Sequence, residues 1–375
     1  MVLLVNLARV IFAPLLREFI AVFGIGEGTA GLIATLAWLG SAALRLPTGW
    51  VLTRVPRHHV VLATGVILTG AAAFVAGATS VVMVGVGALL MGLSSGAYFV
   101  AANPLVSELY PDRVGWAMGV HGTSSQVAAV GAAPFVAAIL AVFADWRVVF
   151  VCISIVAATA TLALFVAARA TDLPDAGADD TDLLGAARSE WRIALVGIAV
   201  VGTTGFVWQG LFNFYELYLE TKGLGAATAR NLLTVVFAAG VPAFFVSGRL
   251  AHRVPRVPYL LTIVGSFAGC LLLLTLADGL AAVVALTVAI GYVIHSLFPA
   301  IDTYLLDALP DDSRASTYAW YSAGMMAVQA TGASAVGTLR ETGLAYDAIF
   351  TRLAAGLFVV VAGVTLLQQR GRLPQ

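Results

Sequence analysis

The charged or titratable side chains inside the long apolar runs of this 375-residue chain include Arg9, Arg45, His295 and Asp302. A charge at the centre of a membrane helix costs at least about 2.5–3.5 kcal/mol on insertion scales, so each of these groups needs an explanation. A buried arginine commonly pairs with a carboxylate or binds an anion. The two arginines therefore predict anion binding. The alternative is an ion pair between helices, such as Arg9 with Asp302.

His295 and Asp302 are the candidates for carrying protons. They are seven residues apart, so on a helix they lie on one face, two turns from each other. A carboxyl group in a low-dielectric cavity can exchange protons near neutral pH, and a histidine titrates there unaided. Asp302, together with His295, is therefore predicted to bind and release protons, as a proton-coupling group does. A fixed salt bridge between Asp302 and Arg9 is the alternative.

Neutral polar side chains add candidates for hydrogen bonding to a solute. Gln209 and Asn213 are four residues apart, which places them one helical turn from each other. Their amides could donate to an oxygen of a substrate. The residues that follow, Tyr215, Glu216 and Tyr218, are equally explained as residues of the membrane interface.

The composition determines the class of protein that must position these residues. Hydrophobic residues make up 60% of the chain and charged residues only 11%, against about 25% charged residues in a typical soluble domain. A membrane-crossing helix needs about 20 apolar residues, so twelve such helices would use nearly the whole chain. The net charge of zero gives no sign of nucleic-acid binding. Cys152 and Cys270 lie in apolar runs and are expected to be packing residues.

Apolar runs separated by Gly, Pro or charged clusters predict an all-α protein with twelve transmembrane helices, since each run is far longer than the about 10 residues of a barrel strand. The polar segment 169–191, which contains five aspartates, divides the chain. We expect an N-terminal six-helix bundle at 1–168, a cytoplasmic acidic linker at 169–191 and a C-terminal six-helix bundle at 192–375. The predicted spans are 2–23, 29–53, 59–78, 81–107, 114–142, 147–168, 192–220, 228–251, 258–277, 280–307, 315–339 and 347–368.

The distribution of basic residues predicts the orientation. If both termini are cytoplasmic, the inner loops carry twelve arginines and the outer loops five basic residues. An excess of Lys and Arg marks the cytoplasmic side, so we expect a multi-pass protein of the cytoplasmic membrane with both termini inside. Arg17 and Glu18 then lie toward the outer end of the first helix, where snorkelling explains them.

An internal repeat relates the two halves of the chain. A shift of 199 residues places Gly49, Arg54 and Arg57 on Gly248, Arg253 and Arg256, and Asn103 on Asp302. One inserted residue then makes the shift 200, so that Phe150 meets Phe350. An offset this constant over more than 300 residues indicates two similar six-helix halves related by an axis along the membrane normal.

The segment from Gly49 to His58 resembles the signature G-x-x-x-D-R-x-G-R-R/K that joins helices 2 and 3 in the major facilitator superfamily. The glycine and both arginines match, whereas Thr53 replaces the acid and Pro56 replaces a glycine. The second copy, 248–256, departs in the same way. Residues 108–115 look like the family's loop between helices 4 and 5, and 145–150 resemble the start of its helix 6. The resemblance covers essentially the whole chain.

This resemblance implies the two-bundle fold and secondary transport of a small solute by alternating access, with protons as the coupling ion and a monomer as the working unit. In the family, helices 1, 4, 7 and 10 line a central cavity. The substrate-binding candidates on these helices are Arg9, Asn103, Gln209, Asn213 and His295, and Arg45 on the second helix is a further candidate. The first motif implies a cytoplasmic gate in which Arg54 and Arg57 pair with Glu108 or with the acidic linker, or serve only to set the topology. Its members are Gly49, Arg54, Arg57, Glu108, Gly248, Arg253 and Arg256.

The surroundings of Arg45 resemble the substrate-arginine region of nitrate/nitrite porters in the same superfamily. Those porters carry a second arginine where the repeat places Phe244 here, and the fifth helix lacks their glycine-dense signature. Nitrate specificity is therefore not expected, whereas another small organic or inorganic anion remains a candidate.

Other functions remain as alternatives. Multidrug/proton efflux is the main one, and the segment Gly131-Ala-Ala-Pro134 is a weak form of the Gly-Pro motif of such antiporters. A receptor that binds without transport is a remote alternative. An intramembrane enzyme using His121 or His295 is another, although no GxSxG, HExxH or metal-ligand spacing supports it. Neither a catalytic residue nor a cofactor nor a metal is therefore expected.

Two glycine patterns have simpler explanations. Residues 26–31 match a GxGxxG nucleotide fingerprint but join two membrane helices without a preceding strand, so nucleotide binding is not expected. The GxxxG pairs Gly92/Gly96 and Gly115/Gly119 predict close contacts between helices.

Overall fold

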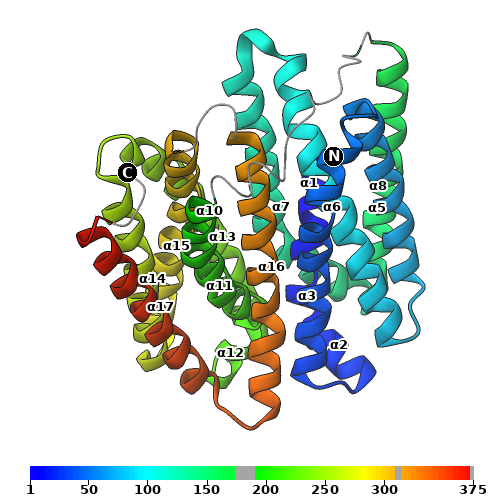
Figure 1. Ribbon diagram of the computed structural model, residues 1–375. Helices are drawn as coiled ribbons and strands as arrows, with labels where there is room; N and C mark the ends of the chain where they lie inside the picture. The colour runs from blue at the N-terminus through cyan, green and yellow to red at the C-terminus, as the bar shows by residue number, and fades with distance from the viewer. Residues whose placement is uncertain (172, 174–190, 309–313, 372–375) are drawn as a thin grey trace. The chain divides into compact units, whose positions relative to one another are not determined.

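The computed structural model describes residues 1–171, 173, 191–308 and 314–371. The chain divides into two compact units, Met1–Thr181 and Asp182–Gln375, and each is described by itself (Figure 1). The division falls in the predicted acidic linker, 169–191, most of which lies outside the described residues. The described residues form helices and contain no strand.

Unit 1 consists of helices that match the first six predicted spans to within about three residues. The outer helix α8 packs on α5, and α6 lies between α3 and α5. The elements are α1 (Val2–Val10), η1 (Ala13–Leu15), α2 (Leu16–Phe23), α3 (Glu27–Ala43), α4 (Arg45–Val51), α5 (Arg57–Ala76), α6 (Val81–Leu109), η2 (Pro111–Arg113), α7 (Val114–Phe143) and α8 (Arg147–Arg169).

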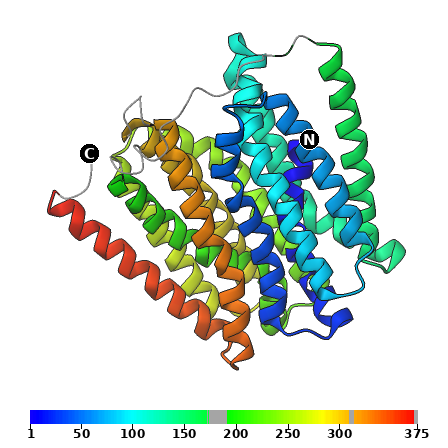
Figure 2. The same cartoon turned by 45° about the vertical axis from the view of Figure 1, so that its right-hand side comes forward.

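Unit 2 repeats this arrangement. α13 packs on α15, and α17, the red helix in Figure 2, lies against α14. The elements are α10 (Trp191–Gly197), η3 (Ile198–Gly202), α11 (Thr203–Asn213), α12 (Tyr215–Thr221), α13 (Ala226–Ala251), α14 (Arg256–Leu276), α15 (Leu280–Ala308), α16 (Arg314–Glu341) and α17 (Tyr346–Gln369).

The protein is an all-α membrane protein of twelve membrane segments. Ten of the described segments are long and apolar enough to cross a membrane as single helices. The other two predicted spans are 2–23, which is broken into three short elements, and 315–339, which lies in α16. α16 is rich in Ser, Thr, Tyr and Gln, which makes it less apolar than the others. With these two, each unit carries six membrane segments.

The first two spans are interrupted four residues before a proline, although the sequence analysis predicted continuous helices. α1 ends at Val10, four residues before Pro14, and α3 ends at Ala43, four residues before Pro47. Proline lacks the N–H that would bond to the carbonyl of the fourth preceding residue, and its ring clashes with that carbonyl. The two prolines therefore explain both breaks.

The seventh span is also broken, but without a proline. A π-helical turn, η3, separates α10 from α11, and Phe214 (φ −101°, ψ 13°) separates α11 from α12. Phe214 is the repeat partner of Leu15, which has nearly the same backbone angles (φ −104°, ψ −8°). The break is therefore a property shared by both halves, and Asn213 occupies the position that Pro14 holds in the first half.

Glycines let helices approach closely at repeat-equivalent points. A Cβ on Gly92 would lie 2.0 Å from the carbonyl oxygen of Ala37, and a Cβ on Gly291 would lie 2.2 Å from that of Val236. These contacts join α3 to α6 and α13 to α15, and Gly96 makes a similar contact with Ser41, so the close contact predicted for Gly92/Gly96 is confirmed. The prediction for Gly115/Gly119 is wrong, because a Cβ on either residue would meet nothing within 4 Å.

One backbone position in unit 1 predicts a stabilising substitution. Ala144 has φ 52°, whereas its repeat partner Gly343 has φ 89°. A left-handed conformation costs a non-glycine residue about 1–2 kcal/mol, part of which is offset by the lower entropy of its unfolded chain. Ala144→Gly is therefore expected to raise the free energy of unfolding by about 0.5–1 kcal/mol, and Gly343→Ala to lower it. Denaturant titration of the purified protein would measure both changes, and a loss of stability in Ala144→Gly would contradict the argument.

Candidate functional site

Arg9 lies at the centre of a group of side chains in unit 1 that we name the arginine cage: Arg9, Trp38, Arg45 and Phe99. The guanidinium carbon of Arg9 is 4.8 Å from the centre of the Trp38 ring and 4.8 Å from that of Phe99. Its Nη2 donates to Asn6 Oδ1 at 2.5 Å, and Asn6 Nδ2 in turn donates to the carbonyl of Ser125 at 2.7 Å. Two aromatic faces and one neutral amide therefore hold the arginine in a fixed orientation.

The charge of Arg9 is buried without a carboxylate partner among the described residues. Arg9 is only 8% exposed, and its Nε has no hydrogen-bond partner. The positive charge of Arg45 repels that of Arg9. Arg45 itself is half-buried at the start of α4, where Pro47 interrupts the second span. This part of unit 1 can bind a negative charge.

Asn103 lies one turn beyond Phe99 on α6. Its Oδ1 is buried and has no hydrogen-bond partner, while its backbone carbonyl accepts from Ser107 Oγ at 3.1 Å. A residue and the fourth residue after it share a helix face, so Asn103 extends the face that carries Phe99. Its free oxygen can accept a hydrogen bond.

His295 occupies a second group in unit 2, which we name the histidine cage: Trp208, Phe237, Phe244, His295 and Phe298. The four aromatic rings have centroids 5.5–6.2 Å from that of the imidazole. His295 Nδ1 lies 2.7 Å from the carbonyl oxygen of Gly291. Because a carbonyl only accepts, Nδ1 carries a hydrogen and donates, which leaves Nε2 for another partner.

The two cages are related by the internal repeat. The shift of 199 residues places Trp38 on Phe237, Phe99 on Phe298 and Arg45 on Phe244, and it places Arg9 on Trp208. The residue at the centre of the cage comes from a different helix in each unit, since α1 supplies Arg9 and α15 supplies His295.

A glycine makes the exchange of the central group sterically feasible. His295 is the repeat partner of Gly96, which packs against Ser41, and Ser41 is the partner of Gly240. A Cβ on Gly240 would lie 2.5 Å from the imidazole ring. At this contact unit 2 therefore has its glycine on α13 instead of α15, and this glycine leaves room for the ring.

Asp302 lies one turn beyond Phe298 on the same helix. It is half-buried, and Tyr318 on α16 donates its hydroxyl to Asp302 Oδ1 at 2.9 Å. Asp302 and His295 thus share α15, but the described contacts do not join them directly. The predicted pair of Arg9 with Asp302 would join the two units and stays a prediction.

Gln209 and Asn213 contact one another in α11, as their spacing predicts. Both are buried, at 1% and 3% exposed. Asn213 Nδ2 donates to Gln209 Oε1 at 3.0 Å and to the carbonyl of Gln209 at 2.9 Å. The neighbouring Tyr215, Glu216 and Tyr218 are buried as well, and their explanation as residues of the membrane interface stays a prediction.

The gate candidates of unit 1 include one ion pair. Arg57 at the start of α5 pairs with Glu108 near the end of α6, with 2.6 Å between Nη1 and Oε1. Arg54 is exposed, donates to Thr53 Oγ1 at 3.1 Å and lies over the Trp50 ring at 4.0 Å. The ion pair therefore joins two helices of the same unit. Gly49 is loosely packed, because a Cβ added to it would meet nothing within 4 Å.

The second copy of the motif is more open. Arg253 and Arg256 are both exposed, and Gly248 packs loosely, since a Cβ added to it would lie 3.9 Å from the nearest atom, in Pro299. Next to this copy, Ser247 Oγ donates to the carbonyl of Ser296 at 2.6 Å.

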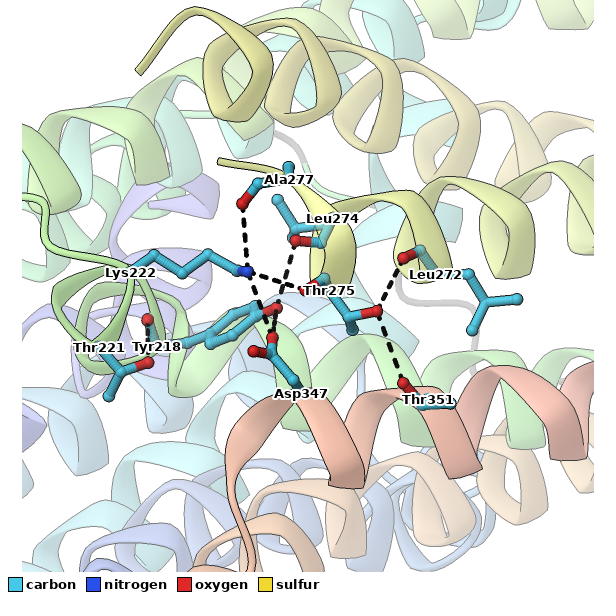
Figure 3. A network of polar contacts seen from close by, with 9 residues as sticks. All are labelled: Tyr218, Thr221, Lys222, Leu272, Leu274, Thr275, Ala277, Asp347 and Thr351. Carbon is cyan, nitrogen blue, oxygen red and sulfur yellow. Dashed lines mark hydrogen bonds and ion pairs between the residues drawn. The ribbon is translucent and has the colours of Figure 1, made fainter. Parts of the chain in front are cut away.

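One end of unit 2 is held by a polar network around Lys222, the only lysine of the chain (Figure 3). Lys222 Nζ donates to the carbonyls of Thr275 and Ala277 at 3.0 and 3.3 Å and pairs with Asp347 Oδ1 at 3.3 Å. Tyr218 donates its hydroxyl to the same carboxylate oxygen at 2.5 Å. The network joins the end of α12, the end of α14 and the start of α17.

Unit 1 has a counterpart of this network at the repeat-equivalent carbonyl. Ala78 is the partner of Ala277, and its carbonyl accepts from Arg147 Nη2 at 2.9 Å and from Nε at 3.2 Å. Arg147 lies at the start of α8 and corresponds to Asp347. Both units therefore place a cation on the same carbonyl, but from different helices.

Sequence reasoning missed the aromatic members of both cages and the partner of Asp302. Trp38, Phe99, Phe237 and Phe298 are apolar residues in apolar runs, and nothing in their local sequence marks them. The repeat offset was the available signal, because it places large aromatic residues opposite one another at these positions. Tyr318 donates to Asp302, for which the sequence analysis had considered only Arg9 as a partner.

Comparisons with known proteins agree on one family. The model of the Major Facilitator Superfamily matches residues 1–333 and 226–371 of the chain. Curated protein sequences gave no match. The family model alone covers more than half of the chain.

Two crystal structures of a bacterial homologue of the human lysosomal transporter Spinster have a similar fold. The inward-facing, unoccupied structure has a TM-score of 0.72 and 16% sequence identity, covering 97% of this chain and 92% of that one. The inward-facing, occupied structure has a TM-score of 0.76 and 17% identity, covering 96% and 94%. At this identity the likeness concerns the fold alone.

Proposed function

The chain belongs to the major facilitator superfamily and is a membrane transporter; from this premise we propose that it is a secondary active transporter of a small organic or inorganic anion. Transport would proceed by alternating access across the cytoplasmic membrane and would be coupled to protons. The single observation that carries the choice of an anion is the buried guanidinium of Arg9, which has no carboxylate partner among the described residues.

The energetics of Arg9 support an anionic ligand. A buried charge is costly unless it is paired and hydrogen-bonded. The rings of Trp38 and Phe99 offset part of the cost, since a cation–π contact contributes about 0.5–2 kcal/mol. One amide hydrogen bond to Asn6 offsets a further part, but Nε keeps an unused hydrogen. An anion supplied by the solute would complete the site.

Arg45 supports the same assignment. Its charge acts on Arg9, and two like charges at close range raise the cost of leaving the site without an anion. A substrate carboxylate or inorganic anion beside Arg9 would offset this repulsion. Asn103, one turn from Phe99, offers a hydrogen-bond acceptor for a protonated or hydroxylated part of the ligand.

The proposed topology rests on the arginine distribution, with both termini in the cytoplasm and the gate motif on the inner side. The pair between Arg57 and Glu108 supports a role in holding the inner ends of α5 and α6 together. Arg54 and Arg253 are exposed, as expected for residues that meet a partner surface in only one conformation. The working unit is proposed to be a monomer.

Multidrug efflux is the second candidate, and the histidine cage favours it. Four aromatic rings surround His295, and aromatic faces attract lipophilic cations. A ligand of that class would bind without the two arginines.

A thermal-stability screen against small anions, neutral solutes and lipophilic cations tests the proposal. A ligand at about 100 times its dissociation constant adds about 2.7 kcal/mol of stability. Carboxylates or inorganic anions are expected to raise the melting temperature of the wild type, and Arg9→Gln and Arg45→Ala are expected to abolish the shift. Arg17→Gln, which removes an exposed arginine from the same span, is the matched control and should retain it.

Two outcomes would contradict the anion assignment. A rise in melting temperature with lipophilic cations alone, unchanged in Arg9→Gln, would favour drug efflux as the function. A shift with anions that persists in both cage variants would make the arginines structural.

A further inference from the structure

The amide pair of Gln209 and Asn213 lies directly before the break between α11 and α12. Asn213 is the last residue of α11, and Phe214 separates it from α12. Both side chains are at least 97% buried in an apolar membrane segment, since their exposures are 1% and 3%. Each amide nevertheless keeps one polar group without a hydrogen-bond partner: Gln209 Nε2 and Asn213 Oδ1.

The hydrogen bonds fix which way both amides point. Asn213 Nδ2 donates to two oxygens, Gln209 Oε1 and the backbone carbonyl of Gln209. Turning Asn213 over would bring its oxygen against that carbonyl, and turning Gln209 over would bring two NH2 groups together. The unused groups are therefore a donor on Gln209 and an acceptor on Asn213.

The fold does not require this polar pair. In unit 1 the repeat partners of Gln209 and Asn213 are Val10 and Pro14, and the same helix break forms there with nearly the same backbone angles. An apolar residue and a proline thus suffice for the break. Two buried amides that each leave a polar group unpaired reduce stability relative to that arrangement, which calls for a reason other than folding.

A hydroxyl group carries both the acceptor and the donor that the two unused groups require. It has one hydrogen to donate, here to Asn213 Oδ1, and lone pairs to accept from Gln209 Nε2. A methyl or methylene group at the same place would leave both amide groups unpaired. Sites built to bind a hydroxyl reject the analogue that lacks it for this reason.

We propose that Gln209 and Asn213 form a hydroxyl-binding subsite, so that the transported solute belongs to the class of small hydroxylated compounds. The inference rests on the proposed function, because it assumes that a solute reaches this face of α11. Combined with the anion assignment, it names hydroxy-carboxylates as the substrate class. An internal water held by the same two groups is the outcome that would compete with it.

Matched ligand pairs test the subsite through the ratio of dissociation constants for each pair. The anionic pairs are lactate with propionate and malate with succinate, and the neutral pair is glycerol with propane-1,3-diol. Binding would be measured by calorimetry or thermal shift on wild type, Gln209→Val and Asn213→Leu. The control is Thr204→Val, which removes a buried hydroxyl of the same helix whose hydrogen bond to the Val200 carbonyl is already made.

The hydroxylated member of at least one pair is expected to bind wild type about tenfold more tightly than its deoxy partner. Gln209→Val and Asn213→Leu should bring the ratio close to one, while Thr204→Val should leave it unchanged. Since the variants need not abolish binding, the deoxy ligand checks that each variant still folds and binds.

Three results would overturn the inference. A wild-type ratio near one for every pair would show no hydroxyl recognition. A ratio that survives both amide variants would place the recognition elsewhere. Lowered stability in Gln209→Val with unchanged ligand ratios would assign the pair to an internal water. The remaining case is that anions fail to bind, but wild type binds glycerol more tightly than propane-1,3-diol and the amide variants remove this difference. The proposed anion specificity would then be wrong, while the hydroxyl-binding subsite would be supported.

Discussion

Asp302→Asn is expected to abolish proton-driven accumulation of the solute while solute exchange across the membrane continues. Asparagine keeps the shape and the hydrogen-bonding oxygen of aspartate but cannot bind and release a proton. Binding and alternation depend on other residues, so exchange should persist. Reconstituted vesicles with an imposed pH gradient would measure accumulation, and counterflow without a gradient would measure exchange.

Tyr318→Phe is the matched variant for Asp302. It removes the hydroxyl that donates to Asp302 Oδ1 but leaves the carboxyl group in place, so accumulation should persist. Undiminished accumulation in Asp302→Asn would exclude Asp302 as the coupling residue. Loss of both accumulation and exchange would instead give it a structural role.

Arg230→Met is expected to lower the free energy of unfolding by about 3–5 kcal/mol. Arg230 forms two hydrogen bonds with Glu216, from Nε at 3.1 Å and from Nη2 at 2.8 Å. Both side chains are largely buried, at 12% and 5% exposed. The substitution would leave the carboxylate of Glu216 in a low-dielectric setting without its guanidinium. Denaturant-induced unfolding of the purified protein, followed by tryptophan fluorescence, would measure the change.

The double variant Glu216→Gln/Arg230→Met separates the ion pair from the packing around it. Because it removes both charges, it is expected to recover most of the stability that Arg230→Met loses. Arg54→Met, at an exposed arginine, should change stability by less than about 0.5 kcal/mol. A double variant as unstable as the single one would attribute the loss to packing instead of charge.

The sequence predicts the positions of the membrane segments well because length and hydropathy decide them locally. The observed helices begin and end within about three residues of the predicted spans, as α8 (Arg147–Arg169) against 147–168 illustrates. The breaks at Val10 and Ala43 coincide with Pro14 and Pro47, but the presence of a proline alone would not have predicted them. Four other prolines lie inside unbroken helices: Pro104, Pro134, Pro242 and Pro299. The break at Phe214 could not have been predicted either, since no proline or glycine adjoins it, and only the repeat relates it to Leu15.

The candidate site was predictable in its charges but not in its surroundings. Arg9 and Asp302 stand out because a charge in an apolar run is rare, and the spacing of Gln209 and Asn213 predicted their contact. What surrounds Arg9 depends on which face of α3 and α6 packs against α1, and no periodicity in uniformly apolar helices fixes that face. The same holds for His295, whose space depends on a glycine of another helix.

The network around Lys222 has a practical consequence. Since the chain contains one lysine, an amine-reactive reagent finds a single side-chain target, apart from the amino terminus. The Nζ group is held by two carbonyls and a carboxylate, and acylation requires it to leave them. The rate of acylation at Lys222 therefore measures how often α12, α14 and α17 separate at this end. Lys222 can thus be used to follow the kinetics of that opening.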